Sequence, residues 1–178
     1  MQDSTSTGEQ AAADAEPGWI EPHERLDRSA ITLWRVNGLI ESGFTFLAAS
    51  AAAAVASLFA DLPWYISGLP LVVALLVAVI TVGVAPTVRW RRWRYEIRDT
   101  EVDLQRGAIY ITRTLVPLAR VQHVDTQQGP LERRFGLATV SFHTAAGAHR
   151  IPALREERSR EVAARIGALA KVARDEPL

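Results

Sequence analysis

Two long runs without a charged side chain lie next to each other and constrain this chain more than any other feature. The first, residues 42–60, contains 19 residues, and as a helix it would extend about 28 Å, enough to cross a hydrocarbon core. The second, residues 62–88, contains 27 residues dominated by Leu, Val and Ile, which is too long for a buried helix of a small domain. We therefore predict a tight transmembrane hairpin, with spans at residues 36–60 and 64–88.

Arginines at the two ends of the hairpin predict its orientation. Three arginines precede the first span and four follow the second, whereas the connecting turn has none. The positive-inside rule then predicts a multi-pass protein of the cell membrane with both termini in the cytoplasm. Aromatic residues suited to the membrane interface fit this orientation. They are Trp34, Trp90 and Trp93 on the inner side and Trp64 and Tyr65 on the outer side.

The overall composition hides a division of charge between the two ends of the chain. Residues 1–61 hold 3 Arg and 9 acidic residues, a net charge of −6, and residues 89–178 hold 17 basic and 11 acidic residues, a net charge of +6. Residues 1–18 lack apolar periodicity and are expected to be a disordered acidic tail, followed by a juxtamembrane segment at 19–35. The absence of cysteine excludes disulfides, thiolate metal sites and cysteine catalysis.

Behind the second span the apolar pattern alternates, which is the period of a half-buried strand. We predict strands around residues 95–97, 102–104, 109–111, 121–124, 137–144 and 149–151, and an extended turn at residues 129–136. From residue 154 the spacing of Val162, Ile166, Leu169 and Ala173 predicts one amphipathic helix. The pattern is typical of six or seven short antiparallel strands followed by a closing helix.

The segment from Pro117 to Leu154 contains the motif GPLERRFG, then a hairpin, then an Ile-Pro step into the helix. This pattern resembles the bacterial pleckstrin-homology-like (PH-like) domain of YdbS-like membrane-flanked proteins, and the resemblance extends over residues 36–172. It implies a cytoplasmic PH-like domain at residues 89–174, with two packed antiparallel sheets of about seven strands capped by the helix. Eukaryotic relatives bind phosphoinositides in a basic pocket between their first strands. Here that region mixes arginines with carboxylates, which argues against such binding.

Two arginine-containing motifs are candidate binding sites. The sequence WRRWR follows the second span. It is interpreted either as a clamp for lipid headgroups or as a simple stop-transfer anchor. The candidate headgroup ligands are Arg89, Arg91, Arg92 and Arg94. The GPLERRFG turn is a candidate contact with lipid, a partner domain or RNA, because loops on a rigid scaffold commonly carry binding. A solvated turn is the alternative. Its candidate residues are Gly129, Pro130, Arg133 and Arg134.

Other reactive residues give weaker hypotheses. Glu41 lies at the edge of the first span, but the second span has no basic partner for it, so a transport role is not favoured. His143 and His149 flank a turn and are expected to be cross-strand neighbours, and two His alone do not predict a metal site. No catalytic or phosphate-binding motif occurs. No exposed basic and aromatic face predicts nucleic-acid binding.

The leading functional hypothesis is a non-enzymatic membrane scaffold without a cofactor. In this hypothesis the hairpin holds the domain at the inner leaflet, where it assembles with copies of itself or with other PH-like membrane proteins. The alternative is a module that recognises anionic membrane lipids through its arginines.

Overall fold

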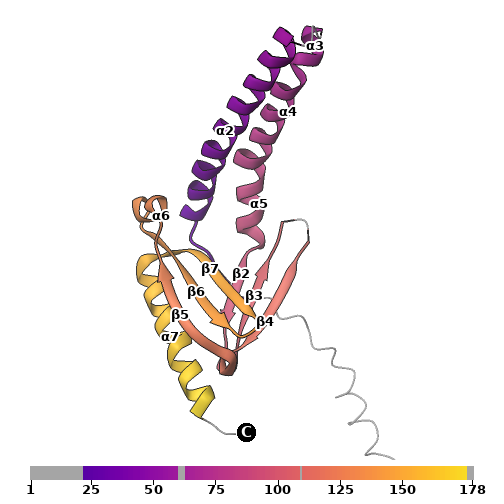
Figure 1. The fold of residues 1–178 in the computed structure, drawn as a ribbon. Helices are drawn as coiled ribbons and strands as arrows, with labels where there is room; N and C mark the ends of the chain where they lie inside the picture. Colours follow the sequence, from indigo (N-terminus) through magenta and orange to yellow (C-terminus); the bar gives the residue numbers. More distant parts are fainter. Residues whose placement is uncertain (1–21, 60–62, 109, 176–178) are drawn as a thin grey trace, which may run out of the picture.

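The computed structural model describes residues 22–59, 63–108 and 110–175, and in it two long apolar helices stand on a domain of strands and one further long helix (Figure 1). The first apolar helix is α2 (Ser29–Phe59). The second is built of consecutive segments, namely α3 (Trp64–Ser67), α4 (Leu69–Ala78), the π-helical η1 (Val79–Val84) and α5 (Ala85–Arg92). Their apolar windows have mean hydropathies of 1.6 and 2.6, and only 6% and 11% of these windows is buried within the protein. Both helices are thus long and apolar enough to cross a membrane, and they expose the surface expected of spans.

The two long helices approach closely where the first contains glycine. A Cβ atom on Gly38 would lie 3.0 Å from the carbonyl oxygen of Thr81, so a larger residue would push the helices apart. One turn later the hydroxyl of Ser42 lies 3.2 Å from that of Thr81. The π-helical η1 ends just before Pro86, which has no N–H to continue the α-helical pattern of hydrogen bonds.

The domain consists of two antiparallel sheets with strand orders β1-β2-β3-β4 and β5-β6-β7. The first sheet contains β1 (Glu24–Arg25), β2 (Arg94–Ile97), β3 (Glu101–Arg106) and β4 (Thr112–Pro117), and the second contains β5 (Val121–Gln127), β6 (Leu137–Thr144) and β7 (Gly147–Arg155). The helix α7 (Glu156–Asp175) buries Val162 and Ile166 against the second sheet. These sheets and the closing helix confirm the predicted architecture.

The first strand comes from in front of the hairpin, which the sequence pattern did not indicate. Residues Glu24 and Arg25 pair with Tyr95 and Arg94 of β2. The residues that follow them, Leu26, Ala30 and Leu33, are at most 4% exposed and belong to the same hydrophobic core as the sheets. The start of α2 is therefore a structural part of the domain, and the hairpin and the domain form one body.

Two local predictions were wrong. The strand predicted at residues 109–111 begins instead at Thr112, and Ile111 lies outside it with 57% of its surface exposed; residue 109 lies outside the described residues. The alternation there did not mark a buried face. The predicted extended turn at 129–136 contains a short helix, α6 (Pro130–Arg134). Its formation is explained by Glu132, whose carboxylate accepts a hydrogen bond from the N–H of Gly129 at 2.9 Å and so caps the helix.

Candidate functional site at the junction of hairpin and domain

A cleft of about 590 Å³ opens where the segment before α2, the end of α5 and the start of α7 meet. Its polar and aromatic lining consists of four arginines, two carboxylates, an indole and a phenol. These are Arg25, Arg28, Arg155, Arg158, Glu24, Asp27, Trp90 and Tyr95. The cleft is open, and it lies beside the ends of the two long helices. This position makes it a candidate binding site.

Two of the four arginines in the cleft form ion pairs with its two carboxylates. Arg155 Nε donates to Asp27 at 2.7 Å, and Arg158 Nη2 donates to Glu24 at 2.8 Å. Arg25 has no carboxylate within 4.0 Å among the described residues, and neither has Arg28, whose guanidinium lies 6.0 Å from the centre of the Trp90 ring. With four arginines against two carboxylates the cleft keeps a net charge of +2, so it suits an anion.

The protonation equilibria in the cleft follow from burial and these pairs. Partial burial acts to raise the pKa of Asp27, but the hydrogen bonds from Arg155 and from the backbone of Ser29 outweigh it and leave the pKa below its ordinary value. Burial, together with the nearby Glu24 carboxylate, raises the pKa of Tyr95 to about 12. The phenol therefore stays protonated near neutral pH and cannot serve there as a base.

The tryptophans predicted at the inner membrane interface have roles in joining the hairpin to the domain. Trp90 Nε1 donates to the carbonyl oxygens of Leu26 at 3.0 Å and Asp27 at 3.1 Å. Trp93 is only 4% exposed and lies in the core of the domain. Trp34 packs against the core and carries the Arg89 guanidinium 4.3 Å from its ring centre. At the far end of the hairpin Trp64 begins α3, and Tyr65 is exposed.

The four arginines of the predicted headgroup clamp are divided between two elements. Arg91 and Arg92 are exposed in the last turn of α5, whereas Arg89 in the same turn stacks on Trp34. Arg94 lies in β2, opposite Arg25 and a glutamine of β3. Of the residues in the last turn of α5, Arg91 and Arg92 are thus exposed and form no ion pair with another described residue.

The predicted partner-binding turn is a short helix held firmly on the domain. Besides Gly129, Glu132 accepts a hydrogen bond from Thr139 at 2.7 Å, and Leu131 and Phe135 pack against the core. Arg133 and Arg134 are exposed, and neither forms an ion pair with another described residue. Figure 1 shows α6 beside the base of α2. A groove of about 370 Å³ joins Ser29 of α2 to Phe135, which follows α6. The two arginines of α6 therefore stand on the side of the domain that faces the hairpin.

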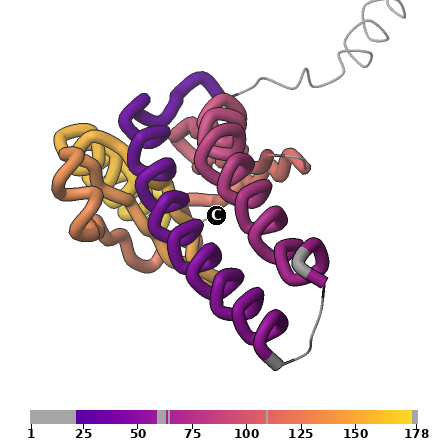
Figure 2. The backbone as a smooth tube through the Cα atoms, turned by 90° about the horizontal axis from the view of Figure 1, so that it is seen from above, coloured from indigo at the N-terminus to yellow at the C-terminus, as the bar shows by residue number. Residues whose placement is uncertain are grey.

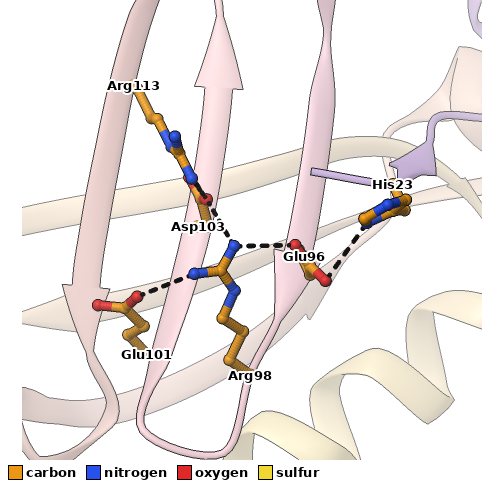
Figure 3. Close-up of polar contacts among 6 residues, drawn as sticks. All are labelled: His23, Glu96, Arg98, Glu101, Asp103 and Arg113. Atoms are coloured by element: carbon orange, nitrogen blue, oxygen red, sulfur yellow. Dashed lines mark hydrogen bonds and ion pairs between the residues drawn. The ribbon is translucent and has the colours of Figure 1, made fainter. Parts of the chain in front are cut away.

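The outer face of the first sheet carries a network of ion pairs (Figure 3). Asp103 is fully buried, Arg113 Nε donates to both of its oxygens at 3.0 Å, and Arg98 lies 3.6 Å away. Arg98 also contacts Glu96 at 3.2 Å and Glu101 at 3.5 Å. The two arginines are matched by three carboxylates, a net charge of −1. The charges of this region are therefore engaged with one another.

The histidines are not arranged as predicted. His149 lies opposite Phe142 and stacks on it at 5.5 Å, whereas His143 lies opposite Ala148 on β7 and opposite His123 on β5. The expectation that His143 and His149 pair across the hairpin was therefore wrong. The turn after Thr144, which pairs with Gly147, sets this register, and the bulge between Ala138 and Val140 lies farther along the strands. Among the described residues no group of three or more His, Asp or Glu is placed to hold a metal ion.

These features define a class of protein, and comparison with known proteins confirms it: the chain belongs to the bacterial PH domain family, whose model matches residues 43–170. The chain is 40% identical over 156 residues to the UPF0699 transmembrane protein YdbS of Bacillus subtilis (strain 168), which covers 88% of this chain and 98% of that protein. The UPF0699 transmembrane protein YdbT of the same bacterium is 30% identical over 94 residues, 53% of this chain but only 19% of YdbT. No solved structure matches significantly. The protein is thus a membrane protein with a bacterial PH domain, and the resemblance inferred from GPLERRFG is confirmed.

Sequence reasoning missed the segment before α2 and therefore missed the junction cleft. The sequence does contain an indication of this segment, because Leu26, Ala30 and Leu33 have the spacing of one apolar helical face ahead of the predicted span. The ion pairs from Asp27 to Arg155 and from Glu24 to Arg158 join residues more than 120 positions apart. No local pattern could have indicated them.

Replacing Arg113 tests the network on the outer face. The Arg113→Ala substitution leaves the buried Asp103 with Arg98 alone, so we expect the full-length protein in detergent to lose about 3 kcal/mol of stability. Chemical unfolding followed by circular dichroism measures this loss. Arg150→Ala is the matched control, because Arg150 is exposed and has no ion pair among the described residues. Equal stability of the two variants would contradict the role of the network.

The pH dependence of stability tests the contact between Asp27 and Arg155. The folded-state pKa of Asp27 is lowered from 3.8, so its ionised form stabilises the fold above pH 3.8, and this contribution is lost as the pH falls through the lower folded-state pKa. Asp27→Asn should lower the melting temperature at neutral pH and bring it close to wild type below the folded-state pKa. A constant difference at every pH would contradict this assignment. The measurement is thermal unfolding across a pH series.

Proposed function

We propose that this protein is a non-enzymatic binding and scaffold protein at the cytoplasmic face of the cell membrane, with both termini in the cytoplasm. It assembles with copies of itself or with other PH-like membrane proteins. The observation that carries this proposal is the shared core, in which Leu26, Ala30 and Leu33 at the start of α2 are buried with the sheets. The domain therefore keeps one orientation relative to the spans, and every copy presents the same surfaces in the plane of the membrane.

Fixed orientation favours assembly for a physical reason. Confinement to a plane raises the effective concentration of binding partners, so weak contacts suffice when their geometry is already correct. Recruitment by a lipid adds little to a domain that two spans already hold at the membrane. The outer face of the first sheet supports the same view, since Arg98 and Arg113 are engaged with carboxylates instead of being free for a phosphoinositide.

The proposed contact surface is α6 with its two exposed arginines, Arg133 and Arg134. Glu132 and the packing of Leu131 hold this helix in place, so little order is lost when a partner binds. Two guanidinium groups on a rigid helix fit an acidic surface of a partner. A hetero-oligomer is supported by the coexistence of YdbS and the much longer YdbT in one bacterium, both similar to this chain.

Recognition of anionic lipids is a second candidate, favoured by the junction cleft. Arg25 and Arg28 lack carboxylate partners among the described residues, and Arg91 and Arg92 are exposed at the end of the nearby α5. Each arginine near an anionic bilayer surface contributes roughly 1 kcal/mol of attraction. The chemistry of the cleft suits a phosphate-containing headgroup of the cytoplasmic leaflet.

One purification distinguishes the two functions. The full-length protein is extracted from its own membrane in a gentle neutral detergent, and both the proteins and the lipids that remain bound are measured by native mass spectrometry. The proposal predicts a stoichiometric protein partner or a homo-oligomer that survives without anionic lipid. We expect the Arg133→Glu/Arg134→Glu double variant to lose it and the matched Arg91→Glu/Arg92→Glu variant to keep it.

The opposite pattern would favour the second candidate. Enrichment of one anionic lipid without any protein partner, abolished by Arg25→Glu/Arg28→Glu, would overturn the assembly function and assign the cleft to lipid. Salt provides a further check, because headgroup binding through exposed arginines weakens steeply as ionic strength rises.

A further inference from the structure

The residues that join β3 to β4 expose apolar surface outside the long helices. Among the described residues of the domain only four large hydrophobic side chains are strongly exposed, and Tyr110 and Ile111 are two of them, at 86% and 57%. The other two, Leu115 and Val172, stand singly on β4 and α7. Two adjacent exposed apolar side chains on a loop cost free energy in water, which indicates that this loop has another environment.

The loop stands beside the long helices at the level where they leave the domain. Figure 1 shows the connection between β3 and β4 rising alongside α5, on the side of the hairpin away from α6. Figure 2, seen from above, also places this part of the chain beside the second helix and α6 beside the first. A groove of about 290 Å³ confirms the closeness, because Ala108 lines it together with Trp34, Glu41, Thr81 and Arg89. Glu41 and Thr81 lie several turns from the domain along their helices, so the groove that Ala108 lines extends onto the membrane-spanning part of the hairpin.

The backbone conformation at Gly107 and the last pair of the β3–β4 ladder determine the path of the loop. Gly107 has a φ of +129°, and a Cβ atom there would lie 1.8 Å from the carbonyl oxygen of Tyr110, so only glycine permits the close return of the chain. The last residues of the ladder, Arg106 and Thr112, pair directly below it. The loop is therefore a tight projection at the end of a paired hairpin.

We propose that Tyr110 and Ile111 insert into the membrane leaflet on the side of the domain, at the boundary between headgroups and acyl chains. A phenol ring suits this depth because its apolar body and polar hydroxyl face the two phases, and the isoleucine beside it suits the acyl side. The exposed Arg106 at the end of β3 lies next to the headgroups. The occupant of this apolar surface is the bilayer that the two long helices already cross, because the loop lies beside the point where the second helix enters the domain (Figure 1).

This third attachment has a mechanical consequence. Two adjacent spans and the domain attached to them can still tilt together as one body relative to the bilayer, whereas a point of contact beside α5 opposes that tilt. Insertion therefore holds the β3–β4 end of the first sheet at the membrane, while α7 runs from near α6 toward the end of the domain far from the hairpin (Figure 1). Insertion of this loop involves the bilayer alone and does not depend on which partner or lipid the proposed function involves.

Site-specific fluorescence tests the insertion, since the chain contains no cysteine and a single introduced one takes the label alone. The full-length Tyr110→Cys variant is labelled with the environment-sensitive dye NBD and reconstituted into nanodiscs with or without doxyl-labelled lipids. We expect blue-shifted emission and a strong loss of fluorescence with doxyl lipids, approaching that of Leu76→Cys, an exposed position within α4. Ile111→Cys serves as a second reporter if Tyr110→Cys does not reconstitute.

Two matched controls make the result decisive. Val172→Cys, 58% exposed on α7, should emit as in water and lose little fluorescence. Leu115→Cys, 51% exposed on β4, lies four residues beyond Ile111, roughly 13 Å along an extended strand, and should be quenched less than position 110. Emission and quenching at positions 110 and 111 equal to those at Val172→Cys would overturn the proposal.

Discussion

The burial of the first turns of α2 in the domain core is the interaction on which the rest of the structure depends. Ala30 is fully buried, and Leu26 and Leu33 are 3% and 4% exposed, beside the sheets that follow the hairpin in sequence. Burying each leucine contributes about 1.5–3 kcal/mol, and Trp90 adds two hydrogen bonds to the same segment. Without this contact β1 and the ion pairs of the junction cleft would have no fixed position.

The arginines of the domain fall into two groups, those paired with carboxylates and those near the hairpin without a carboxylate partner. On the outer face of the first sheet Arg98 and Arg113 are paired with carboxylates around a buried Asp103. Near the hairpin, in contrast, Arg28, Arg91 and Arg133 have no carboxylate partner among the described residues. Paired charges stabilise the domain, whereas unpaired charges near the spans remain available for an anionic surface. The proposed assembly and lipid functions both draw on this second group.

The sequence predicts the parts of the fold that depend on local periodicity. Charge-free runs identified the two long helices, and alternation identified five of the seven strands, whereas the strand predicted at 109–111 begins only at Thr112 and β1 was not predicted. Local periodicity did not predict the positions of residues that depend on contacts with distant parts of the chain. Ile111 fits a strand pattern but lies on a loop beside the helices, and Leu26 lies in the core because of contacts with residues far along the chain. The candidate arginines were visible in the sequence, but which of them are engaged, as Arg89 is with Trp34, depends on three-dimensional packing.

The central claim is that the hairpin and the domain form one body, and a distance measurement across their junction tests it most directly. Spin labels at Leu39→Cys on α2 and Val172→Cys on α7, both exposed, can be placed on the otherwise cysteine-free chain and measured by double electron–electron resonance in nanodiscs. The account predicts a single narrow distance distribution, as narrow as that between labels at positions 115 and 172 within the domain. A broad distribution across the junction, with a narrow one inside the domain, would contradict it.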